Sequence, residues 1–428
     1  MRKMRDSGID WIGTIPQDWQ LSKIGSLYTQ RNEKVSDKDY QPLSVTMQGI
    51  LPQLATAAKT NDGDNRKLVR VGDFAINSRS DRRGSCGISS LDGSVSLINI
   101  ILTPRTAMHP GYYNWLFHTT LFADEFYKWG HGIVADLWTT RWQEMKSITV
   151  PVPEYAEQER IAAFLDAECA EIDAVLEKTR ASIEEYKKLK QAIITQAVTK
   201  GIRGDRPMKD SGIEWIGEIP AGIPISRAGL HFDIVLGKML CSAPVDDNYT
   251  LESYYCAADV HFEGLSNGEK KKMWFSPDEK EQYCVKNGDL LVVEGGAGAG
   301  GCAIAVSTDV PIYIQNSIMI VRSKGISNIR YLRYLLECLV KKGYIDVVCN
   351  KATIPHFTKD KLANVPFIVF SQSDQEEIAE YLNEKCTGID ALIAKKQQYL
   401  TEIGNYKKSL IYEYVTGKKE VKTSVLAD

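Results

Sequence analysis

The sequence predicts an α+β protein in which two mixed α/β globular domains are separated by two long helices, in a pseudo-twofold internal repeat. Three observations support this prediction. A segment of 13 residues occurs twice, two helical blocks carry matching sequences, and a body of mixed strand and helix character precedes each helical block. The length of 428 residues suits several domains better than one.

The repeated opening segment spans residues 4–16 and 208–220. Ten of its 13 positions are identical between the copies, at an offset of 204 residues, and two of the three differences keep the sign of the charge. A repeat of this kind indicates that each copy begins the same structural unit.

The helical blocks, over 154–203 and 371–420, form a second repeat at an offset of 217 residues. Their apolar residues recur mostly at three- and four-residue multiples, which is a heptad-like pattern with Glu and Lys on the remaining faces. About 40 helical residues span about 60 Å, and a lone helix of that length is not expected to stand by itself. We therefore expect the two stripes to pack on each other, with two separate core helices as the alternative. The predicted stripes are Ile161, Leu165, Ile172, Val175, Ile183, Tyr186, Ile193 and Ala197 in the first block, and Ile378, Leu382, Ile389, Leu392, Tyr399, Ile403, Tyr406 and Leu410 in the second.

Two dissimilar bodies, about 17–150 and 221–365, lie between the openings and the helical blocks. Each shows short runs typical of strands, followed by a predicted helix over 111–128 or 328–342. The predicted strands are 43–46, 74–77 and 95–102 in the first body, and 289–293 and the stretch from 312–314 to 320–321 in the second. The chain therefore divides into a first domain (1–153), a central helix (154–203), a second domain (204–370), a C-terminal helix (371–420) and a tail (421–428).

Composition excludes several classes of protein. The chain is 43% apolar and 25% charged, which are globular values. It contains no apolar run of about 18 residues, as a membrane helix would need, and its start lacks the apolar core of a secretory signal. The nine cysteines form no C-x-x-C pair, so we expect no zinc site of the usual spacing and reduced thiols in a cytoplasmic protein.

The charge distribution is more informative than the net charge of −3. The body over 17–150 has 15 Lys and Arg against 13 Asp and Glu, and the body over 221–365 has 16 of each. The acidic excess therefore lies outside the bodies, mostly on the helical blocks. The net charge of the whole chain argues mildly against nucleic acid as a partner, but this argument does not apply to the bodies, which are close to neutral.

Motifs for catalysis or nucleotide binding are weak. Residues 296–301 fit the pattern G-x-G-x-x-G, but a dinucleotide site needs this turn to open a helix, and residues 302–306 look like a strand. Glu294 would also repel a pyrophosphate. We therefore interpret the glycines as a tight hairpin or a close backbone approach. Residues 364–367 are a near miss for an N-P-P-F methyltransferase motif, and the repeat pairs them with the unrelated 147–150, so both are predicted to be strands that lead into the helices.

Cations gather at four places in the bodies, within 66–70, 79–83, 270–272 and 351–361. Such clusters can neutralise phosphates while guanidinium and amide groups read base edges. Ordinary solvated loops are the alternative for any one cluster. The candidate DNA-binding residues are Arg79, Arg82, Arg83 and Ser85 in the first domain, and Lys351, Thr353 and His356 in the second.

The opening segments, at 6–13 and 210–217, resemble the repeated openings of specificity subunits of type I restriction-modification systems. The stretch over 157–166 and the helix tails at 190–201 and 406–418 resemble the same family, so the likeness covers the whole chain. One small departure is Asp374, which replaces the first Glu of the family's E-Q-x-x-I pattern.

The resemblance implies a DNA-recognition subunit without catalysis of its own. Each body would be a target recognition domain for one half of a bipartite DNA site, and the two helices would form an antiparallel coiled coil that sets the spacer. Two methylation subunits and the restriction subunits would be its partners in phage defence. Those partners would methylate adenine with S-adenosylmethionine and cut DNA with ATP and Mg²⁺, so this chain would need no cofactor or metal.

Two other functions remain open at the level of sequence. One is a coiled-coil scaffold or decoy that binds protein and no DNA. The other is a nucleotide-dependent enzyme that uses the glycine turn.

Overall fold

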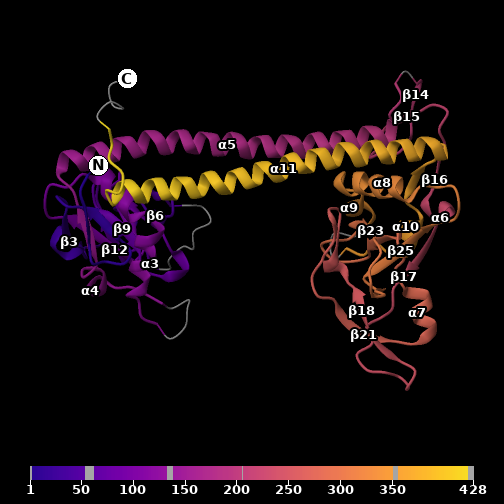
Figure 1. The fold of residues 1–428 in the computed structure, drawn as a ribbon, viewed down its shortest axis with the longest axis horizontal. Coiled ribbons are helices and arrows are strands. Elements are labelled where there is room, and N and C mark those ends of the chain that lie inside the picture. The colour runs from indigo at the N-terminus through magenta and orange to yellow at the C-terminus, as the bar shows by residue number, and fades with distance from the viewer. Residues whose placement is uncertain (1, 54–61, 133–137, 205, 350–354, 423–428) are drawn as a thin grey trace. The chain divides into compact units, whose positions relative to one another are not determined.

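The computed structural model describes residues 2–53, 62–132, 138–204, 206–349 and 355–422. The chain groups into two compact units: unit 1 consists of 1–180 with 397–428, and unit 2 consists of 181–396. Each unit holds one mixed domain and part of both long helices (Figure 1). The predicted α+β class, with two domains and two long helices, is confirmed. The long helices are shared between the units and are not separate bodies.

The repeated opening forms the same β-hairpin in both units. Strands β1 (Met4–Asp6) and β2 (Thr14–Pro16) pair in unit 1, and β14 (Met208–Asp210) and β15 (Glu218–Pro220) pair in unit 2. Oδ1 of Asp6 accepts a hydrogen bond of 3.0 Å from the amide of Gly8, which has a φ of 70°. The second copy repeats this turn, with a distance of 3.0 Å and a φ of 72° at its glycine. Because an L side chain rarely adopts such a φ, this turn requires a glycine at the same position in both copies.

A four-stranded antiparallel sheet of the same strand order lies in each domain. The order is β10-β9-β12-β4 in unit 1 and β23-β22-β25-β17 in unit 2. The two central strands are almost fully buried in each sheet, as their runs of apolar residues predict. These strands are β4 (Tyr28–Arg31), β9 (Phe74–Asn77), β10 (Cys86–Ile88), β12 (Asn99–Pro104), β17 (Phe232–Leu236), β22 (Leu290–Val293), β23 (Cys302–Ile304) and β25 (Ile318–Ser323).

Smaller sheets complete the domains. Unit 1 adds the sheet β11-β8-β5, built from Gly93–Val95, Arg66–Val69 and Lys34–Val35, and the hairpin β6 (Leu43–Thr46) with β7 (Gly49–Pro52). Unit 2 adds the sheet β21-β18-β24, built from Lys271–Phe275, Thr250–Tyr255 and Tyr313–Ile314, and the hairpin β19 (Val260–His261) with β20 (Gly264–Leu265). The strands that lead into the long helices, β13 (Thr149–Val152) and β26 (Pro366–Ile368), pair with β3 (Gln20–Lys23) and β16 (Ile225–Arg227). The single strand predicted over 95–102 is in fact the end of β11 and the start of β12.

The short helices follow the sheets. The helix predicted over 328–342 is α8 (Ile329–Lys341), whereas the one predicted over 111–128 is two helices, α2 (Pro110–Phe117) and α3 (Thr120–Lys128). The break occurs because Thr119 caps α3, its side chain accepting a hydrogen bond from the amide of Phe122. The remaining short helices are α1 (Ile24–Leu27), α4 (Trp142–Met145), α6 (Ala228–His231), α7 (Pro277–Tyr283), α9 (Tyr344–Val348) and α10 (Lys359–Ala363).

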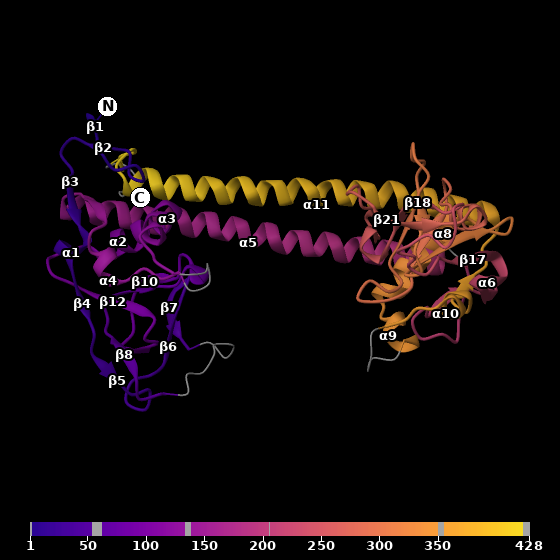
Figure 2. The ribbon, with the colours of Figure 1, turned by 90° about the horizontal axis from the view of Figure 1, so that it is seen from below.

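The long helices α5 (Tyr155–Lys200) and α11 (Gln372–Val415) lie side by side and antiparallel within each unit (Figures 1 and 2). In unit 1, Nζ of Lys407 is 2.7 Å from Oδ1 of Asp173. In unit 2, the equivalent pair is Lys190 with Asp390, also at 2.7 Å. These two ion pairs have the same positions in the 217-residue repeat, with the roles of the helices exchanged. Among the described residues, no helix combines the length and the apolar character needed to cross a membrane.

The predicted apolar stripe is wrong in part. Val175 and Leu392 are exposed, and the residues that follow them, Leu176 and Ile393, are buried instead. The predicted Tyr399 and Tyr406 are also exposed. The buried seam passes through the small residues Cys169, Thr179 and Cys386, which a count of large apolar residues overlooks.

Each domain is attached to the end of the long helix that comes from the other half of the chain. The hydroxyl of Tyr112 in α2 donates a hydrogen bond of 2.8 Å to the carbonyl of Val415, the last residue of α11. In unit 2, the hydroxyl of Tyr331 in α8 donates a hydrogen bond of 3.0 Å to the carbonyl of Val198, in the last turn of α5. Both tyrosines are fully buried.

The repeated glutamine makes a second attachment. The side-chain carbonyl of Gln158 accepts a hydrogen bond of 2.9 Å from the amide of His109, and its amide donates one of 2.8 Å to the carbonyl of Pro153. Gln375 accepts from the amide of Asn328 at 2.8 Å and donates to the carbonyl of Phe370 at 2.8 Å. The glutamine of the E-Q-x-x-I pattern therefore joins the start of a domain helix to the start of a long helix.

Candidate nucleic-acid interface

One hairpin loop occupies the same place in both domains. In unit 1 it spans 79–85, between β9 and β10, and in unit 2 it spans 295–301, between β22 and β23. Each loop pairs with a second segment through an isolated bridge, Arg79 with Thr139 in unit 1 and Gly295 with His356 in unit 2. Each four-stranded sheet thus carries a hairpin loop joined to a second segment, and the residues of these loops differ between the two domains.

The cations of the first loop differ in how free they are. The side chain of Arg82 is 69% exposed and, among the described residues, forms an ion pair with the neighbouring Asp81 at 3.6 Å. Arg83 forms an ion pair with Asp124 and lies 5.9 Å from the ring centre of Tyr127. Arg82 is therefore available to a ligand, whereas Arg83 is held against α3.

The other two candidates in this loop also differ. Arg79 is exposed, and its amide donates a hydrogen bond of 3.0 Å to Oδ1 of Asn77. Ser85 is buried, and its carbonyl accepts a hydrogen bond of 2.9 Å from the amide of Asn77. Ser85 is therefore placed to shape the loop, and Arg79 is placed to contact a ligand.

In the second domain, only one of the three candidates lies among the described residues. Nδ1 of His356 is 3.2 Å from Oε2 of Glu294, and the histidine side chain is 61% exposed. Lys351 and Thr353 lie outside the described residues. The amide of Gly296 donates to the carbonyl of Pro355 at 3.1 Å. His356 and the glycine loop therefore form one surface.

The glycine loop leads into a strand, β23, and not into a helix. This agrees with its interpretation as a tight hairpin. Gly296 and Gly300 have φ values of 87° and 82°, and a Cβ on Gly300 would lie 2.8 Å from Ile345. Gly298 differs, because the nearest atom to an added Cβ would be 3.8 Å away. The backbone at Gly298 is exposed, so a ligand can approach it closely.

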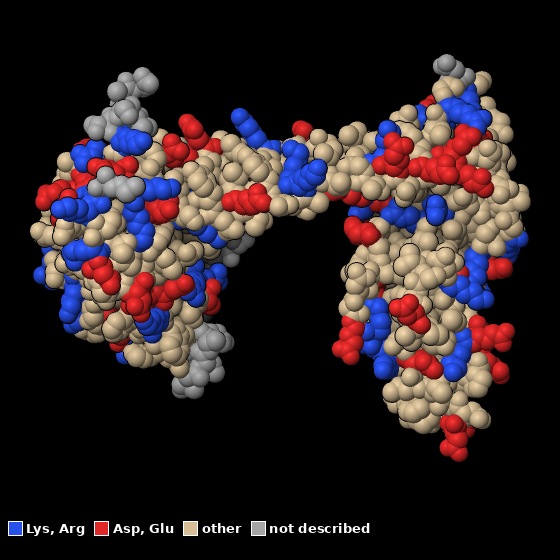
Figure 3. All heavy atoms as spheres, in the orientation of Figure 1, with Lys and Arg blue, Asp and Glu red and all other residues tan. Residues whose placement is uncertain are grey.

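In two of the four cationic clusters, one cation is bonded within the protein. Arg66 is 4% exposed, and its guanidinium donates to Oγ and to the carbonyl of Ser94 at 2.8 and 2.9 Å. Lys270 forms an ion pair of 3.1 Å with Asp259. Sequence spacing does not distinguish these structural cations from free ones. Figure 3 shows Lys and Arg interspersed with Asp and Glu over the visible face of each unit.

Sequence reasoning missed the surroundings of Arg79. A pocket beside it is lined by residues from several distant segments, among them Lys67, Arg141 and Trp142. Lys67 belonged to a recognised cluster, but no spacing signal connects it with Arg141.

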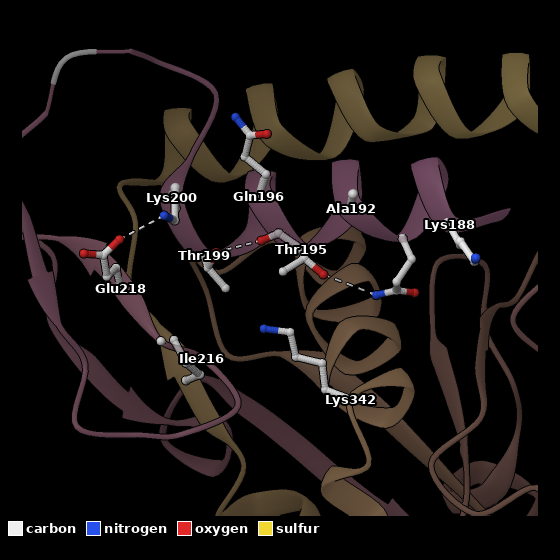
Figure 4. Close-up of a pocket in the computed structure, with 11 residues that line it drawn as sticks. Lys188, Ala192, Thr195, Gln196, Thr199, Lys200, Ile216, Glu218 and Lys342 are labelled. Carbon is white, nitrogen blue, oxygen red and sulfur yellow. Dashed lines mark hydrogen bonds and ion pairs between the residues drawn. The ribbon is translucent and has the colours of Figure 1, made fainter. Parts of the chain in front are cut away.

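A second pocket, a groove of about 780 Å³, lies in unit 2 along the last turns of α5 (Figure 4). Thr195, Thr199 and Lys342 face it, and Lys200 forms an ion pair of 3.0 Å with Glu218 at one end. In unit 1, the position of Thr195 is taken by Tyr412, whose hydroxyl donates to the carbonyl of Ile12 at 2.9 Å. The larger side chain therefore contacts the opening segment of unit 1 directly.

The departure at Asp374 has a structural counterpart. Glu157 accepts hydrogen bonds from Arg2 and, at 2.8 Å, from the indole of Trp19. Asp374 lies 3.5 Å from Arg206, the equivalent of Arg2. The position that corresponds to Trp19 is Ile223, which has no indole to bond. Asp374 instead has a second arginine, Arg203, at 3.3 Å.

Comparisons with known proteins agree with this arrangement. Residues 263–402 match the family model described as "Type I restriction modification DNA specificity domain". The chain is 24% identical to the type I restriction enzyme MjaVIII specificity subunit of Methanocaldococcus jannaschii, over 95% of this chain and 94% of that protein. The chain is therefore similar to specificity subunits of type I restriction-modification systems over most of its length.

Two solved structures share the fold of this chain. The HsdS subunit from Thermoanaerobacter tengcongensis is similar over 95% of this chain and 98% of its own, with a TM-score of 0.53 and 17% identity. A chain from a study of complex assembly and conformational transition of the type I R-M system matches 95% of this chain and 99% of its own, with a TM-score of 0.73 and 16% identity. Within the described residues, no group of three or more His, Cys, Asp or Glu is placed to hold a metal ion.

Proposed function

We propose that this chain is a type I specificity subunit that recognises a bipartite DNA target, with each domain reading one half. The observation that carries the proposal is the pair of loops at 79–85 and 295–301. They occupy equivalent places on sheets of the same strand order and differ in nearly every side chain. One scaffold with two different reading surfaces is what recognition of two dissimilar half-sites requires.

The two loops suit two different ways of contacting DNA. Arg82, which is mostly exposed, can donate two hydrogen bonds to O6 and N7 of a guanine. The glycine loop offers backbone amides and little steric bulk, and the neighbouring His356 and Glu294 can exchange hydrogen bonds with base edges. We therefore assign base reading mainly to side chains in the first domain and to close backbone approach in the second.

The long helices are proposed to set the spacer and to bind the partner subunits. Both are continuous across the boundary between the units, and a helix of fixed length is a stiff connector. The acidic excess outside the bodies favours protein partners on the helices. The groove beside α5 is a candidate place for part of a methylation subunit.

The chemistry is assigned to those partners. Adenine methylation would use S-adenosylmethionine on the methylation subunits, and a target base within a duplex must leave the stack before transfer. ATP and Mg²⁺ would serve the restriction subunits. This chain would supply DNA position and sequence choice without a catalytic group of its own.

An exchange of one domain tests this proposal. Residues 17–150 are replaced by the corresponding body of another family member, and the complex with its methylation subunits is assayed for the sites that it methylates. One half of the target should change while the other half and the spacer stay the same. A change in both halves would contradict the assignment of one domain to each half, and a complex that binds no DNA would favour a protein-binding scaffold.

A further inference from the structure

A cationic pocket of about 350 Å³ lies beside the loop at 79–85 in unit 1. Three of its lining residues are Lys67, Arg79 and Arg141, and Gln30 and Trp142 also face it. None of the described residues that line it is an Asp or a Glu. A pocket with three cations and no acid in its wall has the electrostatic character of an anion site.

The three cations come from separate segments. Lys67 is on β8, Arg79 follows β9, and Arg141 directly precedes α4. Within the described part of the chain, none of these three side chains forms an ion pair. They approach one another only in the folded domain. Glu144, which does not line the pocket, accepts a hydrogen bond of 3.0 Å from the backbone amide of Arg141.

Backbone hydrogen bonds hold the walls of the pocket in place. The amide of Thr140 donates to the carbonyl of Ser78 at 3.0 Å, and the amide of Ser80 donates to the carbonyl of Trp138 at 3.1 Å. These bonds join the loop that carries Arg79 to the segment that carries Arg141. The pocket is therefore part of the domain before any ligand arrives.

Lys67 is the most constrained of the three. Its Nζ donates a hydrogen bond of 2.6 Å to the carbonyl of Asn99, which leaves the ammonium two further donors. Burial lowers the pKa of this ammonium, because desolvation disfavours its charged form. An anion in the pocket would offset that cost.

We propose that the pocket holds one backbone phosphate of the DNA half-site that the first domain reads. This inference rests on the proposed function and adds Lys67 and Arg141 to its DNA-binding residues. Lysine provides a point charge for a phosphate, and arginine provides a fork of donors. A phosphate held here would fix the register in which Arg82 meets a base. The second domain has Gly295 at the position of Arg79, so the contact is assigned to the first domain.

The test measures DNA binding by the complex with its methylation subunits, on the methylated target, over a range of salt concentrations. The variants are Lys67→Gln and Arg141→Gln, with Lys67→Arg to restore the charge and Lys23→Gln as the matched control. Lys23 is exposed on β3 and does not line the pocket. Each neutral variant should lower the slope of log K against log salt by about 0.9, since one phosphate contact is lost.

The weakening by each neutral variant should be equal for DNA with a correct or an altered half-site, because a phosphate carries no sequence. Lys67→Arg and Lys23→Gln should keep the wild-type slope. In a further series, each DNA has one phosphate replaced by an uncharged methylphosphonate. At one position, this replacement should weaken binding by the wild-type complex but should not weaken binding by Lys67→Gln any further, because the variant has already lost that contact.

Unchanged slopes in both neutral variants of a complex that still binds its target would overturn the phosphate inference and leave the proposed function standing. A loss confined to one base pair would also overturn it, in favour of base reading. A wild-type complex that binds no DNA would overturn both.

Discussion

The hydroxyl of Tyr331 should stabilise the end of α5, and removing it is the sharpest test of how the domains are attached. The carbonyl of Val198 lies in the last four residues of α5, where no amide four residues later completes a helical bond. The hydroxyl of Tyr331 supplies a donor at 3.0 Å, and it also contacts the carbonyl of Ile368 at 3.2 Å. Burial raises the pKa of Tyr331 well above its ordinary value, so the group remains a donor.

The substitution Tyr331→Phe removes one oxygen and leaves two buried carbonyls without this donor. The expected cost is about 1–3 kcal/mol, the range for a buried polar group that loses its partner. Tyr112→Phe should act in the same way on α11, with a smaller effect, because only its bond to Val415, at 2.8 Å, is short and its contact with Pro151 is 3.5 Å.

Hydrogen exchange resolved by peptide measures this effect locally. Tyr331→Phe should speed exchange in the last turn of α5 and in β26 by about 5- to 150-fold, the equivalent of 1–3 kcal/mol, and should leave the end of α11 unchanged. Tyr113→Phe is the matched control, because the buried hydroxyl of Tyr113 has no hydrogen-bond partner among the described residues. Equal effects of Tyr331→Phe and Tyr113→Phe, or faster exchange in both units, would refute the attachment.

Four further predictions concern the loops, the spacer and pH. Arg82→Gln should weaken binding of the target by about 1–3 kcal/mol and relax specificity at one base pair of one half-site, whereas Arg83→Gln should have a smaller effect in the same binding assay. Gly298→Ala should weaken DNA binding and leave the melting temperature unchanged. Gly300→Ala should lower the free energy of unfolding of unit 2 by about 1–2 kcal/mol from its positive φ alone, as measured by thermal unfolding. A seven-residue insertion in both α5 and α11, at the boundary between the units, adds about 10 Å to each helix and should lengthen the methylated spacer by about three base pairs at 3.4 Å each. Burial lowers the pKa of His118 below its ordinary value of about 6.5, so the folded protein favours the neutral imidazole. The stability that this imidazole contributes should therefore be present above pH 6.5 and should be lost as the pH falls below it. The difference in melting temperature between wild type and His118→Gln should shrink over the same range.

The sequence predicted the features that depend on local order. The repeat of the opening segments identified two equivalent units, and the apolar periodicity located both long helices close to their ends. The exact buried face was missed, because Cys169 and Thr179 complete a seam that large apolar residues alone do not trace. The break between α2 and α3 was missed because it depends on the cap made by Thr119.

The candidate site was less predictable, since it depends on contacts between distant residues. Arg82 and Arg83 are neighbours in sequence but differ in how free their side chains are. The reason is Asp124, about 40 positions further along, which forms an ion pair with Arg83. The approach of Lys67 and Arg141 to Arg79 likewise requires the folded sheet. A cluster of cations in sequence identifies a region, whereas the tertiary structure decides which members are free.

Mapping of methylated bases on a library of random DNA tests the central claim most directly. The purified complex of this chain with its methylation subunits is incubated with the library and S-adenosylmethionine, and the modified positions are read by single-molecule sequencing. We expect methylated adenines within two specified half-sites of different sequence, separated by an unspecified spacer of constant length. A single continuous motif, or methylation that is independent of sequence, would contradict the account.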